Sequence, residues 1–174
     1  MGGNGKDSKK YKLMIIVKIS DVKDFMKKLF LKEIFDNFLL VSIDIKTASD
    51  FKIDGKRNKE WYDEENEADT DYIKWKEVRE QAAFLIKGER PPLFIKSVFR
   101  LSEENTAKLA VKADESADIK SLGMFFTLKF DGKELFITTG VSYYDFLKTK
   151  RFEEFWDENL LKFLKYFDIY TEKV

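Results

Sequence analysis

Carboxylates are the side chains of this sequence best suited to chemistry, because the chain contains neither cysteine nor histidine. Thiol nucleophiles, imidazole bases and the usual zinc ligands are thereby excluded. Asp44 stands in a predicted strand, where an aspartate can hold Mg²⁺ for phosphoryl transfer. The alternation of that strand places Asp44 opposite its apolar residues, so we expect it to face solvent. Asp54 and Asp131 each precede a glycine, which indicates turns rather than catalysis.

A run of acidic residues is the other concentration of carboxylates. It lacks the Asp-x-Asp-x-Asp-Gly spacing that wraps a calcium ion, so we interpret it as an exposed connection. The glycines near the N-terminus lack the preceding strand and following helix of a phosphate-binding loop. We therefore predict that the protein is not an enzyme and holds neither a metal nor a cofactor. The acidic run comprises Asp63, Glu64, Glu65, Glu67, Asp69 and Asp71.

Four lysines gather on the polar side of a helix predicted over residues 21–31. With Asp21 and Asp24 beside them they leave a local charge of about +2, and basic side chains on one helix face can contact phosphates. The whole chain, however, balances 32 basic against 32 acidic residues, so any nucleic-acid binding is expected to be weak and local. These speculative nucleic-acid-binding residues are Lys23, Lys27, Lys28 and Lys32.

Composition indicates one soluble globular domain. The chain is 44% hydrophobic and 37% charged, and aromatic residues make up 16% of it, mostly at periodic positions typical of a core. No apolar run is long enough to span a membrane and no signal peptide is recognisable, so a cytoplasmic location is expected. Residues 1–11 are predicted to form a disordered tail, and residues 12–174 a single α+β domain with antiparallel sheets.

Helical spacing of apolar residues predicts four helices. Ser20 and Ser102 are the expected N-caps of the first and third, and Gly88 ends the second. The last helix has the strongest pattern, because an almost wholly apolar stripe runs along one side of it from Phe152 to Phe167, which predicts a place in the core. The predicted helices span 21–31, 72–87, 103–111 and 152–167.

Alternating apolar residues predict short strands between these helices. The clearest hairpin turns at Asp131-Gly132, and Asp54-Gly55 is a second favoured turn. Trp61 and Tyr62, within the acidic connection, are expected to fold back as an anchor. The predicted strands span 13–19, 38–46, 51–53, 93–101, 124–130, 134–139 and 141–146.

The order of strand, helix, strand and strand occurs twice. Ser20 superposes on Ser102 at an offset of 82 residues, and Leu39 superposes on Met124 at an offset of 85. We interpret residues 12–56 and 93–147 as two related β-α-β-β units, with 72–87 as an inserted helix. The alternative is a chance similarity of two such units.

Several short pieces resemble a family of small uncharacterised proteins from anaerobic Gram-positive bacteria, over about residues 13–167. That family has no assigned activity, so the resemblance implies no catalytic or binding residue. The pieces that carry it are Phe38-Leu39-Leu40, Phe51-Lys52-Ile53-Asp54-Gly55, Leu101-Ser102-Glu103-Glu104-Asn105 and Thr138-Thr139-Gly140.

The repeat also resembles, more weakly, one domain of the DNA polymerase processivity clamps. That resemblance implies two helices packed side by side on curved antiparallel sheets, with basic helix faces toward DNA. The chain departs from the clamp pattern by having one such domain, an inserted helix over 72–87 and an appended C-terminal helix. These departures put ring formation in doubt.

Three functions remain open from the sequence. The first is a non-enzymatic clamp-like module that interacts with a protein or with nucleic acid. The second is a helix-grip domain that binds an apolar small molecule in a Phe-rich cavity, and the third is a structural adaptor without a ligand. If the helices over 21–31 and 103–111 pack as a pair, the first is favoured; if the C-terminal helix alone fills a concave sheet around a cavity, the second is.

Overall fold

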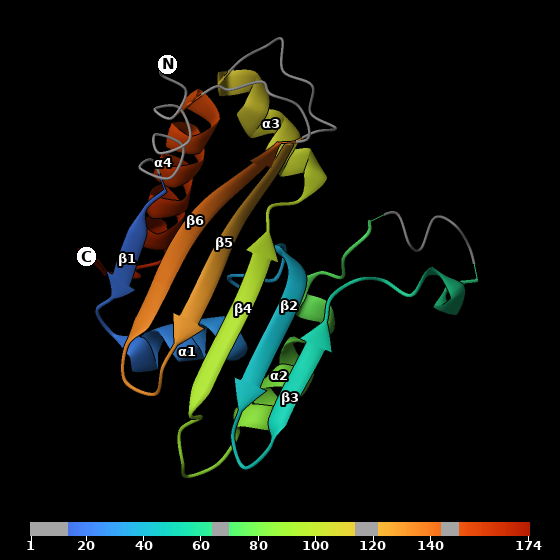
Figure 1. Ribbon diagram of the computed structural model, residues 1–174, viewed down its shortest axis with the longest axis vertical. Helices are drawn as coiled ribbons and strands as arrows, with labels where there is room; N and C mark the ends of the chain where they lie inside the picture. The colour runs from blue at the N-terminus through green and yellow to red at the C-terminus, as the bar shows by residue number, and fades with distance from the viewer. Residues whose placement is uncertain (1–13, 64–69, 114–121, 144–149) are drawn as a thin grey trace, which may run out of the picture.

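One seven-stranded antiparallel sheet forms the frame of the protein in the computed structural model, which describes residues 14–63, 70–113, 122–143 and 150–174. The strands lie side by side in the order β3-β2-β4-β5-β6-β1-β7 (Figure 1). This arrangement confirms the α+β class expected from the sequence, whereas the predicted tail lies outside the described residues. The strands are β1 (Ile16–Ile19), β2 (Leu39–Lys46), β3 (Asp50–Asp54), β4 (Phe94–Arg100), β5 (Leu122–Phe130), β6 (Leu135–Tyr143) and β7 (Thr171–Lys173).

The helices cover one face of this sheet (Figure 1). Strand residues on the covered face, such as Ile43, Phe99 and Phe126, are fully buried, while their neighbours on the other face are half-buried or exposed. We call that second face the open face. Among the described residues, no helix is long and apolar enough to cross a membrane. The helices are α1 (Val22–Phe30), α2 (Arg79–Ile86), α3 (Glu103–Ala113) and α4 (Lys150–Tyr166).

The starts of α1 and α3 follow local side-chain capping. Ser102 caps α3 as expected, because its hydroxyl accepts a hydrogen bond from the Asn105 N–H at 3.2 Å. In α1 the expected cap is wrong by one residue. The carboxylate of Asp21, not the hydroxyl of Ser20, accepts a hydrogen bond from the Asp24 N–H at 3.0 Å.

The helix predicted over residues 72–87 is shorter than expected. Its first residues are extended, with isolated β-bridges that join Tyr72 to Lys56 and Lys74 to Leu39. A 3-10 turn spans Trp75–Glu77, and α2 begins at Arg79. The physical reason is long-range pairing: two backbone hydrogen bonds at Ile73, to Leu40 and to Gly55, hold this segment straight.

Gly55 joins β3 to this extended segment and does not form a hairpin turn. Its N–H donates to the carbonyl of Val41 and its own carbonyl accepts from the N–H of Ile73, each at 2.9 Å. A Cβ at this position would overlap the carbonyl of Leu40. Asp54 does make turn contacts, since its carboxylate accepts from the Lys56 N–H at 3.0 Å, but the chain then runs on to pair with Tyr72.

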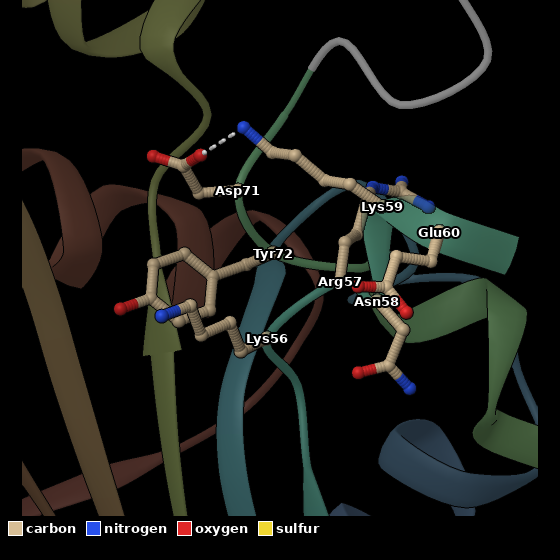
Figure 2. Close-up of a pocket in the computed structure, with 7 residues that line it drawn as sticks. All are labelled: Lys56, Arg57, Asn58, Lys59, Glu60, Asp71 and Tyr72. Carbon is tan, nitrogen blue, oxygen red and sulfur yellow. Dashed lines mark ion pairs between the residues drawn. The ribbon is translucent and has the colours of Figure 1, made fainter. Parts of the chain in front are cut away.

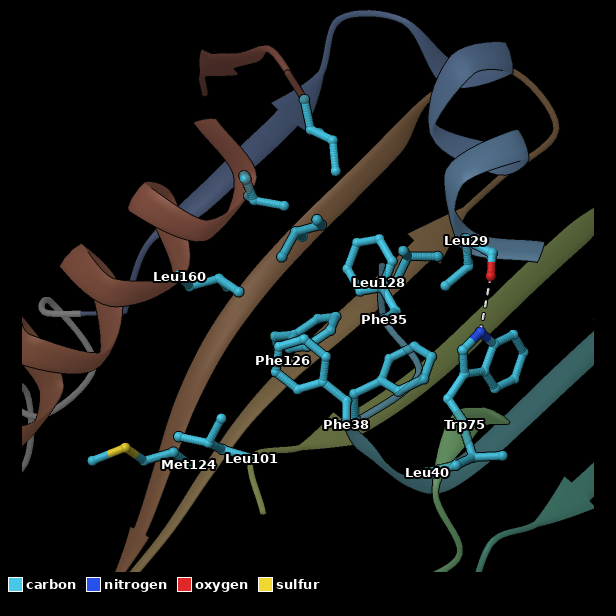
Figure 3. Close-up of a cluster of buried hydrophobic side chains, with 14 of the residues drawn as sticks. Leu29, Phe35, Phe38, Leu40, Trp75, Leu101, Met124, Phe126, Leu128 and Leu160 are labelled. Atoms are coloured by element: carbon cyan, nitrogen blue, oxygen red, sulfur yellow. Dashed lines mark hydrogen bonds between the residues drawn. The ribbon is translucent and has the colours of Figure 1, made fainter. Parts of the chain in front are cut away.

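Aromatic side chains fill the space between the sheet and the helices (Figure 3). Phe126 of β5 stacks on Phe99 of β4 at a centroid distance of 5.1 Å and receives the edge of Phe38 at 5.0 Å. The indole N–H of the buried Trp75 donates to the carbonyl of Leu29 at 2.9 Å, which ties the 3-10 turn to the end of α1. Ten of the aromatic side chains that the structure describes are therefore buried in the core, as periodic positions indicated.

The strand order does not confirm the internal repeat. Exchanging β1, β2 and β3 with β4, β5 and β6 preserves the hairpin pairs β2–β3 and β5–β6. It does not preserve the other pairings, because β4 lies next to β5 while β1 does not lie next to β2. The two similar β-α-β-β units therefore enter the sheet in different ways.

Candidate functional site

A groove between α3 and α4 combines an apolar floor with a polar rim. Its volume is about 450 Å³. The two helices contribute residues at helical spacing, so one side of each helix lines the groove. The floor is apolar and includes Phe38, Leu101, Leu109, Leu160 and Phe163. Four of these, Phe38, Leu101, Leu109 and Leu160, also belong to the buried core cluster, so the floor rests on rigid packing. Figure 3 labels Phe38, Leu101 and Leu160 in that cluster.

The rim of the groove carries three amides and two ammonium groups. Asn37 precedes β2, Asn105, Lys108 and Lys112 project from α3, and Asn159 projects from α4. All five residues are exposed. These amides both donate and accept hydrogen bonds, while the lysines only donate and carry positive charge. The groove can therefore hold an apolar body and present cations and amide donors to an anionic head group.

The charge at the rim is only partly neutralised. Lys108 forms an exposed ion pair with Glu104 at 3.0 Å, one turn away on α3. For Lys112 no ion pair is present among the described residues. An exposed ion pair is weak and opens easily, so both ammonium groups can reach a bound anion.

A buried carboxylate lies on the side of α4 that faces the sheet. Asp157 is 8% exposed, and its Oδ1 accepts a hydrogen bond from the Thr139 hydroxyl of β6 at 2.5 Å. Burial raises the pKa of Asp157 to about 6; the hydrogen bond from Thr139 lowers it, and the carboxylates of Glu153 and Glu154 raise it further. Sequence reasoning missed this residue, because its partner comes from a strand that periodicity does not connect to α4.

A second pocket is lined by the chain from Lys56 to Glu60 together with Asp71 and Tyr72 (Figure 2). The ion pair drawn there joins Lys59 to Asp71 at 3.3 Å. The nearby Arg57 is engaged in the fold, because it donates two hydrogen bonds to Glu77, at 3.0 and 2.9 Å. These contacts join two stretches of chain, which explains the charges without a ligand.

The two predicted anchor residues, Trp61 and Tyr62, lie next to these Arg57 contacts but differ from each other in burial. The Tyr62 hydroxyl accepts a hydrogen bond from Arg57 at 2.6 Å, so Tyr62 does fold back. Trp61 is 84% exposed, and its expected role is wrong. Desolvation acts to raise the pKa of Glu77, but hydrogen bonds from Arg57 and from the Lys74 N–H hold it below its usual value.

The four lysines predicted on the first helix differ in their contacts. Lys28 is 18% exposed and pairs with Asp24 at 2.7 Å, and it also donates to the carbonyl of Asp168 at 3.1 Å. Lys23 and Lys27 border a groove between α1 and α2, while Lys32 follows the end of the helix and is exposed. The structure therefore separates the predicted nucleic-acid-binding residues into one structural side chain and three exposed ones.

The carboxylates considered for metal binding are dispersed. Asp44 is half-buried on the open face, opposite Lys52 of β3 and Lys96 of β4. Asp131 accepts hydrogen bonds from the N–H groups of Glu134 and Lys133, which lower its pKa and close the predicted hairpin turn. Within the described ranges, no three potential ligands gather around one point. The acidic run lies largely outside those ranges.

The α3–α4 groove was not recognised from the sequence. Its signal is present in α3, where Asn105, Lys108, Leu109 and Lys112 share one helical side, but polar and apolar residues mix on that side. A mixed side of this kind is typical of the border between the buried and the exposed face of a helix. The groove becomes recognisable only when α4 lies beside α3.

Comparison with known proteins identifies the family. A search of curated proteins and a search of solved structures found no match. The model of a "Family of unknown function (DUF5721)" matches residues 28–172, which include the whole groove between α3 and α4. The chain therefore belongs to the DUF5721 family.

Proposed function

We propose that this protein is a non-enzymatic cytoplasmic binding module whose α3–α4 groove takes an amphipathic anion, a small molecule with an apolar body and a carboxylate or phosphate head. The observation that carries the proposal is the union of an apolar floor and a cationic, amide-rich rim in one cavity. A volume of about 450 Å³ lies within the range of about 300–1,000 Å³ common for small-molecule sites.

The way the helices pair supports this function over the clamp-like module. The clamp resemblance implied that α1 packs against α3. Instead, α1 packs against α2, and α3 packs against α4. The groove also differs from a helix-grip cavity, since it lies between two helices rather than between a helix and a concave sheet. The clamp-like interaction with a protein or with nucleic acid stays a prediction from the sequence.

Binding of dodecanoate tests the proposal. We expect it to displace the fluorescent anion 8-anilinonaphthalene-1-sulfonate from the protein, while dodecanol and dodecyltrimethylammonium displace it much less. The apolar tail is common to all three probes, so a difference between them reports the contribution of the rim cations. Equal displacement by all three would leave only a nonspecific apolar surface and would overturn the proposal.

Two matched pairs of variants locate the binding. Asn159→Trp places a bulky ring in the groove from an exposed position, and we expect affinity to fall by about tenfold or more. Glu158→Trp places the same ring on the neighbouring, exposed residue outside the lining and should change little. Lys112→Glu should likewise weaken binding, with Lys162→Glu on the exposed side of α4 as its control. If the control of either pair weakens binding as much as its partner, the groove is not the site.

A further inference from the structure

The open face of the sheet carries a concentration of positive charge and aromatic rings at its centre. Register places Lys96 of β4 opposite Lys129 of β5, and Lys129 opposite Phe136 of β6. Arg100 likewise lies opposite Phe125. We call these five residues the central patch. They point to the open face because they alternate with the buried residues of the same strands.

Carboxylates are absent from the open face of β4, β5 and β6 in the described residues. Apart from the central patch, the residues of these strands that face this way are Phe94 and a small set of valine, threonine, serine and glycine. The open-facing aspartates, such as Asp44 and Asp50, lie on β2 and β3. Asp50 is opposite Lys46, and Asp44 lies between Lys52 of β3 and Lys96 of β4. In a chain of zero net charge, Lys96, Arg100 and Lys129 give the open face of β4, β5 and β6 a positive charge, with Asp44 at its β2 edge.

The cations of the central patch form no ion pair in the part of the chain that the structure describes, although Asp44 of β2 is the cross-strand neighbour of Lys96. Lys96 and Lys129 are both exposed and directly opposite, an arrangement of like charges that destabilises a sheet. The guanidinium of Arg100 lies 5.5 Å from the centre of the Phe125 ring, and its Nε is buried without a hydrogen-bond partner. An anion placed over the patch would relieve the repulsion between Lys96 and Lys129.

The rings of the patch lie where flat groups can stack. The ring of Phe125 covers Gly123, since a Cβ there would approach its Cε2 at 2.7 Å. Phe136 is half-buried between Lys129 and Lys18, of which Lys18 is held by Glu134 at 2.8 Å. Phe125 is four residues from Lys129, the partner of Phe136, so the two rings are about 14 Å apart along the strand direction.

We propose that the central patch binds single-stranded nucleic acid, with phosphates on Lys96, Lys129 and Arg100 and with bases stacked on Phe125 and Phe136. Single strands suit this surface because their unstacked bases can lie on aromatic rings, whereas a duplex keeps its bases inside. The proposal concerns the sheet face opposite the helices and is independent of ligand binding in the α3–α4 groove (Figure 1).

Fluorescence anisotropy with labelled oligothymidylate and oligouridylate of about 16 nucleotides tests the proposal. We expect micromolar binding at low salt and a log–log salt slope of about −2, which corresponds to three phosphate contacts at about 0.7 each. A DNA duplex and poly-glutamate serve as comparison anions. If either binds as tightly as the single strands, the patch is a nonspecific anion surface or a protein contact, and the proposal is overturned.

Variants assign the binding to the patch. Lys96→Glu combined with Lys129→Glu should weaken binding at least tenfold, while Lys46→Glu with Lys52→Glu, on the same face outside the patch, should cost less than threefold. Phe136→Leu keeps the apolar contact but removes the ring, and we expect at least a fivefold loss for single strands. Melting temperatures of all variants check that the fold is intact. No binding by the wild type at low salt, or an unchanged affinity in Phe136→Leu, would overturn the proposal.

Discussion

The hydroxyl of Thr139 in β6 donates a hydrogen bond of 2.5 Å to the carboxylate of Asp157 in α4. Thr139 is 1% exposed and Asp157 is 8% exposed, so this contact joins helix and sheet inside the protein. The Ile15 N–H also donates to the Thr139 hydroxyl at 3.2 Å, which links the chain before β1 to the same point. A titratable group at such a junction makes folding stability depend on pH.

The contribution of Asp157 to stability should fall as pH rises from about 4 to about 6. The pKa of Asp157 is raised to about 6 in the folded protein, so over this window the folded state holds a proton that the unfolded state has released. Asp157→Asn keeps an acceptor for Thr139 and removes the charge. We expect it to raise the free energy of unfolding at pH 7 by about 1–2 kcal/mol and to flatten this part of the profile. Urea unfolding at several pH values measures both effects, and an unchanged profile in the variant would contradict the assignment.

Trp156→Ala should destabilise the protein strongly. Trp156 is 1% exposed, and its indole N–H donates to the carbonyl of Phe125 at 2.7 Å. Truncation of a buried Trp typically costs about 3–5 kcal/mol, which would lower the melting temperature by many degrees. Phe163→Ala should cost less, because Phe163 is only half-buried at the groove. Tyr166→Ala is the control, since Tyr166 lies on the same helix and is 80% exposed; equal losses in all three variants would contradict the burial of the stripe.

Gly55→Ala should be among the more damaging single-methyl additions. Its Cβ would overlap the carbonyl of Leu40, so the backbone of β2 or β3 must move. We expect a loss of about 3 kcal/mol or more in unfolding free energy. Gly140→Ala is a matched control on β6, because its Cβ would meet Met14 only at an ordinary 4.0 Å. A loss in Gly140→Ala as large as in Gly55→Ala would show that steric overlap at Leu40 is not the cause.

The α1 lysines should differ in their effect on stability. Lys28→Glu removes the ion pair with Asp24 and the hydrogen bond to the carbonyl of Asp168, and it places two like charges together. We expect a loss of about 1 kcal/mol, visible as a lower melting temperature. Lys32→Glu changes an exposed residue after the helix and should have little effect. Equal effects from the two variants would show that the contacts of Lys28 add nothing to the fold.

Local patterns in the sequence predicted much of the secondary structure. The period of apolar residues indicated α1, α3 and α4, because one buried side of a helix recurs along the chain whatever it packs against. The hairpin at Asp131 was equally local, since its carboxylate bonds to backbone groups two and three residues away. The helix prediction was wrong around Ile73 for the opposite reason. Its backbone partners lie at Leu40 and Gly55, which no helical period reveals.

Tertiary structure alone decided which residues meet. The strand order placed Lys129 between Lys96 and Phe136, and the packing of α3 against α4 created the groove lined by Lys112 and Asn159. The physical reason is that periodicity shows which side of an element is buried but not which other element covers it. That choice depends on the summed burial of side chains far apart in the chain, so both candidate sites emerge only after the sheet and its helices are assembled.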